Sequence, residues 1–278
     1  MTKKSGLSFI CPVCNKKLIQ ESNSFTCASG HCFDVSKYGY VNLLLANKMN
    51  SHDPGDDKDM VKSRASFLEK DYYRSLRTAI EQTAIKYTDK HAKVLDLGCG
   101  EGYYTAGLLC ALNQADKSPD LYGVDISKAA TKLAAKKCNQ AHIAVASVFH
   151  LPIENESIDL MLNCFSPLCT DEINRCLKHD GVFLYVVPGQ KHLWQLKCAL
   201  YDKPYENERK DEEYSGLTFC GSVHIKEVIH LKSGEDIKNL FQMTPYCWKT
   251  SQHDRDKLFS KNELDTQIEF YINIYKKN

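Results

Sequence analysis

The sequence predicts an α/β protein with a doubly wound, mainly parallel sheet and a small zinc-binding module in front of it. Two observations predict this architecture. Strand-like and helix-like segments alternate between residues 93 and 200, which is typical of βαβ units in a parallel sheet. Before that region, cysteine and histidine recur at the short spacings of a metal site.

Composition sets the class of protein. The chain has 278 residues and is 43% hydrophobic, which is enough for a large core with a smaller addition. Thirteen cysteines without a secretory signal indicate a reducing compartment, where thiols stay free or bind metal. No apolar run has the length of a membrane span. We therefore expect a cytoplasmic protein without a membrane anchor.

Charge is distributed unevenly along a chain whose net charge is only +1. The first fifty residues hold six lysines against two acidic residues, a surplus of four positive charges. A basic head of this kind suggests a polyanionic partner. Further on, Arg64, Arg74 and Arg77 either line a path for RNA or are ordinary solvated charges.

The metal site is predicted from the pattern C-x2-C-x12-C-x3-H, formed by Cys11, Cys14, Cys27 and His31. Each short pair can place two ligands on one tetrahedral ion. Cys32 competes with His31 for the fourth position, because both cannot easily bind one ion tetrahedrally. Few apolar residues are available to build a core here, so a structural zinc ion would hold the module together. These residues are Phe9, Leu18, Ile19, Phe25 and Phe33.

We expect three parts in the chain. They are a zinc-binding module at residues 1–35, a connecting segment with helices at residues 36–90, and a sheet domain at residues 91–278. In the connecting segment, a loop rich in Asp, Pro and Gly comes before two periodic helices. The predicted helices are Asp59–Glu69, with a break at Asp71, and Tyr73–Tyr87.

The sheet domain begins with a glycine-rich turn that carries most of the functional information. Gly98, Gly100 and Gly102 follow a strand at alternate positions, which differs from the dinucleotide fingerprint and from the phosphate loop. Asp96 lies inside the end of this strand and would face a cationic group. Asp125 ends the next strand, where an acid commonly bonds the two hydroxyls of a ribose. A cationic nucleoside without phosphate fits this combination, and S-adenosylmethionine is such a cofactor.

The remaining elements follow in order. The predicted strands are Lys93–Leu97, Asp120–Val124, Ala141–Ser147, Ser157–Asn163 and Gly181–Val187. The predicted helices between and after them are Tyr104–Leu112, Ser127–Lys137, Asp171–Leu177 and His192–Leu200. After a charged connector we expect a strand, a capped helix and a half-buried antiparallel strand. These four segments are Tyr201–Tyr214, Leu217–Leu231, Ser233–Phe241 and Ile268–Ile274.

Five stretches together resemble one family. They are the cysteine and histidine pattern, His52–Asp56 (HDPGD), Leu95–Thr105 (LDLGCGEGYYT), Pro188–Leu193 (PGQKHL) and Met243–Tyr246 (MTPY). In order and spacing they resemble the RlmA (RrmA) family of bacterial 23S rRNA guanine-N1 methyltransferases, over nearly the whole chain. The resemblance implies a class I, Rossmann-like methyltransferase fold with a seven-stranded sheet. It also implies a homodimer that methylates N1 of one guanine in a hairpin loop of domain II.

The resemblance also implies roles for residues at matching positions. The implied zinc ligands are Cys11, Cys14, Cys27 and His31. The implied cofactor contacts are Tyr73, Gly100, Glu101 and His192. Cys32 departs from the family pattern and would be a spare thiol beside the zinc. The basic surplus, which includes Lys16 and Lys17, suggests that the zinc module contacts rRNA phosphates while the sheet domain holds the guanine.

The loop after the fourth strand is where methyltransferases of this kind hold a target base. Asn163 and Ser166 are candidate catalytic residues there, because they could bond the guanine edge. Three aromatic residues could stack on the base or simply pack in the core. They are Phe165, Tyr246 and Trp248. Ser147, at the end of the third strand, would lie near the adenine of the cofactor, and the general base is not identified.

Two other functions use part of the same pattern. A methyltransferase for proteins or small molecules would share the glycine turn and Asp125, but it would not need a basic zinc module. An RNA-binding module that merely retains the fold would not need the intact Asp96, the glycines or Asp125. The sequence therefore favours the rRNA methyltransferase over both.

Overall fold

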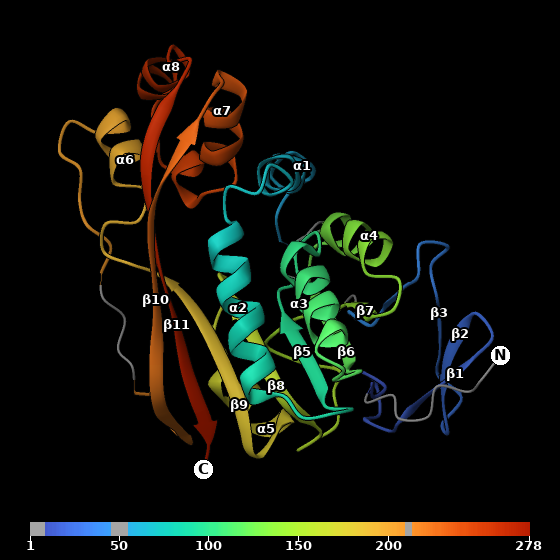
Figure 1. Cartoon of the computed structure of the whole chain (residues 1–278). Coiled ribbons are helices and arrows are strands. Elements are labelled where there is room, and N and C mark those ends of the chain that lie inside the picture. The colour runs from blue at the N-terminus through green and yellow to red at the C-terminus, as the bar shows by residue number, and fades with distance from the viewer. Residues whose placement is uncertain (1–8, 46–54, 209–212) are drawn as a thin grey trace.

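A computed structural model describes residues 9–45, 55–208 and 213–278 (Figure 1). Its centre is a twisted sheet with helices on both faces. Within the described residues this sheet has eight strands, in the order β10-β11-β9-β8-β5-β6-β7-β4. No helix in these ranges combines the length and the apolar character needed to cross a membrane.

The middle of the sheet is parallel, as the alternation of segments predicts. Its strands are β5 (Lys93–Leu97), β6 (Asp120–Asp125), β7 (His142–Val145), β8 (Ile158–Cys164) and β9 (Leu177–Pro188). The helices that follow them are α3 (Tyr103–Gln114), α4 (Lys128–Lys137) and α5 (Thr170–Cys176). From β5 the chain runs outward through β6 and β7, and it then crosses to the other side of β5 and runs outward through β8 and β9. The carboxyl ends of β5 and its neighbours therefore form the crevice where such sheets bind ligands.

One edge of the sheet is antiparallel. The strand β10 (Leu217–Leu231) pairs with β11 (Leu264–Lys277) along its length, and β11 pairs with β9. The expected strand at Leu217–Leu231 is confirmed, and Ile268–Ile274 lies within β11. Ile268, Phe270 and Ile272 are fully buried on a face of the sheet, in an apolar cluster with residues from several helices.

The other edge corrects the expected strand count of seven. The strand β4 (Tyr40–Asn42) adds to β7 in parallel and makes eight. Tyr40 and Val41 are buried against the sheet as the chain leaves the zinc module. A three-residue strand is too short to show alternation, so the sequence indicated only a joining segment there.

The connecting helices lie close to their predicted positions. They are α1 (Lys58–Leu68) and α2 (Arg74–Tyr87), separated by a turn in which Asp71 has φ of 59°. Farther along the chain come α6 (Trp194–Leu200) and α7 (Gly234–Gln242), and the Ser233 side chain caps α7 as expected. The 3-10 helix η2 (Pro245–Trp248) and α8 (Gln252–Phe259) were not predicted. The helix α8 buries only Leu258, so it has no apolar stripe to read.

The zinc module forms a three-stranded antiparallel sheet of β1 (Leu18–Glu21), β2 (Ser24–Cys27) and β3 (Cys32–Asp34). It packs directly on the main sheet. The Phe9 ring meets the Tyr122 ring edge-on at 5.3 Å, and the Ile10 N–H donates to the Pro152 carbonyl at 2.9 Å. Phe9, Leu18 and Phe25 thus belong to the core of the larger domain and Phe33 packs against it, whereas Ile19 is exposed.

Candidate functional site

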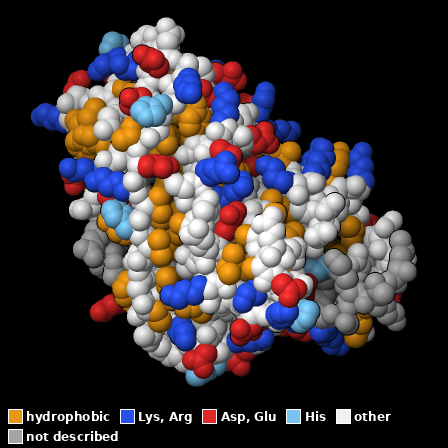
Figure 2. All heavy atoms as spheres, viewed as in Figure 1, with side chains coloured by type: hydrophobic (Ala, Val, Ile, Leu, Met, Phe, Trp, Pro, Cys, Tyr) orange, Lys and Arg blue, Asp and Glu red, His pale blue; other side chains and the backbone are white. Residues whose placement is uncertain are grey.

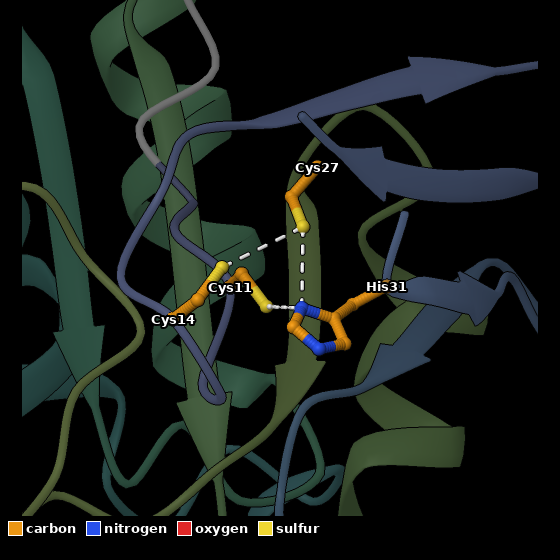
Figure 3. A group of neighbouring side chains, drawn as sticks. All are labelled: Cys11, Cys14, Cys27 and His31. Atoms are coloured by element: carbon orange, nitrogen blue, oxygen red, sulfur yellow. Dashed lines mark hydrogen bonds between the residues drawn. The ribbon is translucent and has the colours of Figure 1, made fainter. Parts of the chain in front are cut away.

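The predicted metal ligands converge on one point (Figure 3). Sγ of Cys11 and Sγ of Cys27 each lie 3.4 Å from Nδ1 of His31, and the Cys14 and Cys27 sulfurs are 3.6 Å apart. All four ligand atoms lie within 4.8 Å of one another. Cys11 and Cys14 come from the turn before β1, while Cys27 and His31 flank the turn between β2 and β3.

These spacings fit a tetrahedral zinc ion. With about 2.3 Å to sulfur and about 2.0 Å to nitrogen, two sulfur ligands stand roughly 3.8 Å apart and sulfur and nitrogen roughly 3.5 Å apart. Cys32 is exposed at the start of β3, and its sulfur lies 3.9 Å from the hydroxyl of Thr26. The geometry therefore favours His31 over Cys32 as the fourth ligand.

The glycine turn after β5 is built so that backbone comes close to its neighbours. Gly98, Gly100 and Gly102 have φ of 72°, 56° and 86°, in the left-handed region that favours glycine. A Cβ on Gly98 would lie 2.3 Å from Cβ of Ser166, and one on Gly102 would lie 2.9 Å from Cα of Ala134. At Gly100 no atom comes closer than 4.0 Å, so a ligand can rest on the backbone there.

Asp125 lies at the end of β6, beside this turn. Its carboxylate accepts hydrogen bonds from the backbone N–H groups of Gly100 at 2.9 Å and Ser127 at 2.8 Å. Burial raises the pKa of Asp125, and the two N–H donors oppose this shift. Each carboxylate oxygen keeps a further lone pair, so Asp125 can also accept hydrogen bonds from the hydroxyls of a ribose.

Asp96 and Glu101 add two more buried carboxyl groups at the turn. The hydroxyl of Thr105 donates to Asp96 at 2.6 Å and fixes its orientation. Burial raises the pKa of Asp96 to about 7 and also raises the pKa of Glu101. A group of buried acids is stabilised by a bound cation. This site therefore fits the sulfonium and ammonium charges of S-adenosylmethionine.

Arg64 lies over the turn, which the sequence did not reveal. Its guanidinium bonds Asp56 at 2.5 Å and stands 4.0 Å from the Cβ position of Gly100. It is largely buried among Asp56, Glu101 and Asp125, and these acids raise its pKa although burial opposes the shift. Of the HDPGD stretch at His52–Asp56, residues 52–54 lie outside the described residues. A cation here can meet the carboxylate end of an amino acid.

Tyr73 and His192 meet on the far side of the β5 end. Both rings contact the buried ring of Phe270, at 5.0 Å and 4.5 Å. Burial lowers the pKa of His192 to about 3, so its imidazole is neutral. Nδ1 of His192 accepts the backbone N–H of Glu269 at 3.3 Å. Its Nε2 therefore carries the proton and is a hydrogen-bond donor.

The loop after β8 separates the two candidate catalytic residues by role. Asn163 is fully buried, and its side chain bonds the Ser166 N–H at 3.1 Å and the Pro167 carbonyl at 3.2 Å. Asn163 thus shapes the loop from within. The Ser166 hydroxyl is buried without a hydrogen-bond partner in the described part of the chain. An unpartnered buried hydroxyl against the cofactor turn suits a bound ligand.

Phe165 stands out in the same loop. Its φ is 65°, a left-handed conformation that is strained for a bulky residue, and its side chain is 46% exposed. The centre of its ring lies 5.5 Å from that of Phe270, which also contacts Tyr73 and His192. Backbone strain that displays an aromatic ring is typical of a ligand site. Trp248 is also exposed, whereas Tyr246 is half-buried and packs on Tyr201.

The other basic candidates, Arg77, Arg74 and Lys17, each lie beside an acidic residue. Arg77 lies over the Tyr103 ring at 4.8 Å and pairs with Glu81 at 3.1 Å, so it joins α2 to α3. Arg74 is exposed and lies 3.6 Å from Asp71. Lys17 faces Glu154 at 3.6 Å across a cleft of about 660 Å³.

This cleft lies between the zinc module and the sheet domain. Ile10 and Lys17 line it on one side, while Ser147, His150 and Arg175 line it on the other. The glycine turn does not contribute to its walls. Ser147, which the sequence placed near the adenine, lines this cleft.

The fold and the site together define an S-adenosylmethionine-dependent methyltransferase that carries a zinc ribbon. Comparison with known families agrees. Residues 88–261 match the family described as "Methyltransferase domain", and residues 9–52 match the zinc ribbon family described as "RlmA, N-terminal".

Similar proteins identify the family more closely. A Bacillus subtilis protein named "Putative 23S rRNA (guanine-N(1)-)-methyltransferase YxjB" is 30% identical over 97% of both chains. The 23S rRNA (guanine(748)-N(1))-methyltransferase of Streptomyces fradiae is 35% identical, over 68% of this chain and 66% of that protein. A Micromonospora griseorubida protein named "Putative 23S rRNA (guanine-N(1)-)-methyltransferase" is 30% identical over 67% of this chain and 67% of that protein. The chain belongs to the RlmA family of 23S rRNA guanine-N1 methyltransferases.

Proposed function

We propose that this protein transfers a methyl group from S-adenosylmethionine to N1 of one guanine in 23S rRNA. One observation carries the proposal. An RlmA-type zinc ribbon precedes a methyltransferase domain in this chain, and a relative whose name gives this activity matches 97% of it. The target would be a guanine in a hairpin loop of domain II, as family likeness suggests.

The cofactor supplies an electrophilic methyl group when it is bound. Its ribose would be held by Asp125, and its methionine part by Asp96, Glu101 and the backbone at Gly98–Gly102. Arg64 is well placed for the carboxylate of that part, since its guanidinium reaches over Gly100. Tyr73 and His192 would close the site from the other side, with Nε2–H of His192 as a donor.

The target base has to leave its stack before it can react. N1 lies on the Watson–Crick edge of guanine and carries a proton, so a paired guanine hides it. The exposed ring of Phe165 offers a surface for stacking, and the unpartnered Ser166 hydroxyl offers a hydrogen bond to the base edge. Asn163 would act as a positioning residue, because its side chain holds the loop in shape. The methyl group would pass from the sulfonium sulfur to N1, S-adenosylhomocysteine would be released, and the N1 proton would pass to solvent.

The zinc ion would be structural, held by Cys11, Cys14, Cys27 and His31. Four protein ligands leave no position for a reactive water. We also propose that the protein is cytoplasmic and works as a homodimer. None of its thirteen cysteines forms a disulfide in the structure, and the ten that would not bind zinc are free thiols, which fits a reducing compartment.

A labelled methyl group tests this function directly. The protein is incubated with methyl-labelled S-adenosylmethionine and total RNA and protein from a strain that lacks the gene. We expect label in 23S rRNA and its recovery as 1-methylguanosine after digestion. Label in protein or in a small molecule would support the other methyltransferase classes. The absence of transfer, with RNA still bound, would support a binding module that only retains the fold.

A further inference from the structure

Three lysine side chains gather around one tyrosine ring at the junction of the zinc module and α4. The ammonium groups of Lys132, Lys136 and Lys37 lie 4.3, 5.0 and 5.3 Å from the centre of the Tyr38 ring. We call these four residues the Tyr38 cluster. Lys37 and Lys136 are exposed, and Lys132 and Tyr38 are half-buried.

Fold stability does not account for this cluster. One cation would satisfy the ring, and Lys132 and Lys136 are like charges four residues apart on one helix, which is an unfavourable spacing. Within the described residues, no carboxylate lies within 4.0 Å of these three ammonium groups. The neighbouring Lys137, in contrast, pairs with Glu69 at 3.6 Å. Three uncompensated cations at one place favour an anionic ligand.

The cluster is held in shape from both sides. Tyr38 lies in a tight turn closed by the Gly39 N–H and the Ser36 carbonyl at 2.8 Å, and Gly39 has φ of 96°. The helix α4 is fixed by its Ser127 cap and by a buried core that includes Tyr40 and Ala134. Charges on a rigid frame lose little entropy when a ligand binds.

The position of the cluster links the two parts of the proposed enzyme. The helix α4 begins three residues after Asp125, and Lys132 and Lys136 lie about 6 and 12 Å along its axis from its first residue. Tyr38 belongs to the segment that leaves the zinc module and enters β4. Figure 2 shows Lys and Arg side chains gathered over the upper right of the molecule, where α1 and α4 lie.

We propose that Lys37, Lys132 and Lys136 bind phosphates of the rRNA strand that leads from the zinc module to the cofactor site. This inference rests on the proposed function, because it names a contact surface for the same RNA. Lysine binds phosphate as a point charge, so the cluster contributes affinity and register but no base specificity. Tyr38 serves as the surface on which the lysine stems are arranged.

The chemistry of the cluster agrees with this role. The hydrogen bond between Lys132 and the Tyr38 hydroxyl lowers the pKa of Tyr38, and the charges of Lys132 and Lys37 lower it further. The surroundings of Tyr38 are therefore positive. The cluster also replaces part of the role expected for Lys17, whose charge is shared with Glu154 across the cleft. The basic surplus of the first fifty residues thus acts through Lys37, together with lysines that follow Asp125 in the sequence.

The test exchanges the three charges and keeps the stems. In the full chain, the triple variant Lys37→Gln, Lys132→Gln, Lys136→Gln is compared with the native protein on a 23S rRNA transcript. We expect the KM for RNA to rise between about tenfold and hundredfold at about 0.15 M salt, and the slope of log affinity against log salt to fall by roughly 2–3. Turnover at saturating RNA and the affinity for cofactor should stay close to native values.

Two matched variants sharpen the test. The triple Lys→Arg variant at the same positions should restore the KM and the salt slope. Lys86→Gln, Lys90→Gln and Lys117→Gln together remove the same charge just before β5 and β6, two strands in the middle of the sheet, and should leave both unchanged. If this control triple weakens RNA binding as much as the cluster triple does, only net charge matters and the inference is wrong.

The outcomes also separate the inference from the proposed function. If the native protein methylates the transcript while the cluster triple keeps its KM and salt slope, the inference fails and the function stands. If the native protein binds and methylates no RNA, the proposed function fails first, and the inference fails with it.

Discussion

Asp96 is a carboxylic acid held close to its titration point at the centre of the cofactor site. Burial raises its pKa to about 7, so in the free protein it is partly protonated near neutral pH. A cationic ligand favours the ionised form. Cofactor binding should therefore lower this pKa and release a proton.

We predict that affinity for S-adenosylmethionine rises between about pH 6 and about pH 8. Asp96→Asn should bind more weakly and lose this dependence. His192, with its pKa of about 3, does not titrate in that range. Calorimetry in two buffers of different ionisation enthalpy measures the released proton. Equal proton release by Asp96→Asn and the native protein would contradict the assignment.

The same shift affects stability in the opposite direction. The folded-state pKa of Asp96 is raised above its unfolded value, so the folded protein binds more protons between about pH 4 and about pH 7. The free protein should lose stability as the pH rises through this window. Thermal melts should show a smaller loss for Asp96→Asn, and saturating cofactor should reduce the loss in the native protein. A melting temperature that rises steadily with pH for the native protein alone would be the opposite result.

Asp125 gives a direct test of the ribose assignment. Asp125→Asn should weaken cofactor binding by roughly 1.5–3 kcal/mol, the range for hydrogen bonds to a charged group. Asp120→Asn, at the other end of the same strand, is the matched control and should leave cofactor affinity unchanged. Titration calorimetry that finds equal affinities for native protein and Asp125→Asn would remove Asp125 from the site.

At the residue scale, the sequence was informative where function and chain position coincide. Asp96, the glycines and Asp125 lie at strand ends, so their place in the crevice follows from the strand pattern. The place of Arg64 depends on how α1 packs over a turn more than thirty residues later. The internal role of Asn163 depends on loop geometry, which no periodicity reveals.

The loop between β8 and α5 is the element where strain and function meet. Phe165 has a left-handed backbone and a half-exposed ring, so it gains little from burial. Natural proteins keep such strain where activity needs it. A substitution that relieves the strain in this loop should therefore reduce activity without a loss of stability.

We predict that Phe165→Gly leaves the free energy of unfolding within about 1 kcal/mol of the native value, because glycine adopts this φ without strain. RNA methylation should fall strongly, since the stacking surface is lost. Cofactor affinity should not change, which separates the effect from damage to the glycine turn. Urea unfolding and single-turnover methylation measure the two quantities. Loss of stability without loss of turnover would assign Phe165 to the core.

At the element scale, strong periodicity gave the right element and short segments did not. The strands β5 and β10 match their predicted bounds, because each carries a clear apolar pattern. The three residues of β4 become a strand only because β7 offers an edge to pair with. The helix α8 forms on a polar stretch that is capped by Ser251, and its single buried leucine could not reveal it.

At the scale of the whole molecule, the zinc ribbon and the sheet domain share one of the buried apolar clusters. Phe9 and Leu18 from the zinc ribbon are buried together with Leu97 and Tyr122 from the sheet. The sequence predicted that the ribbon could not fold on its own apolar residues, and it expected zinc to compensate. The structure adds that the sheet compensates as well.

Removal of zinc should therefore loosen both the zinc ribbon and the part of the sheet domain that it contacts. We expect one zinc ion per chain, and chelation should increase hydrogen exchange in residues 9–35 and also around Pro152, which accepts the Ile10 N–H. The helix α7 should stay protected, because its buried residues Ile237, Leu240 and Phe241 belong to a separate apolar cluster that holds no ribbon residue. Exchange changes confined to residues 9–35 would show two independent units. Purified protein without zinc would contradict the metal site itself.

Methylation of one atom, N1 of a guanine in 23S rRNA, can be detected in RNA taken from cells. A methyl group on guanine N1 blocks Watson–Crick pairing, so reverse transcriptase stops one nucleotide before it. Primer extension is run on 23S rRNA from a strain that lacks the gene, from the same strain carrying the native gene, and from one carrying Asp96→Asn. We predict a single strong stop in a domain II hairpin loop with the native gene, no stop without it, and a weak stop with Asp96→Asn. An identical pattern of stops in all three strains would contradict the account.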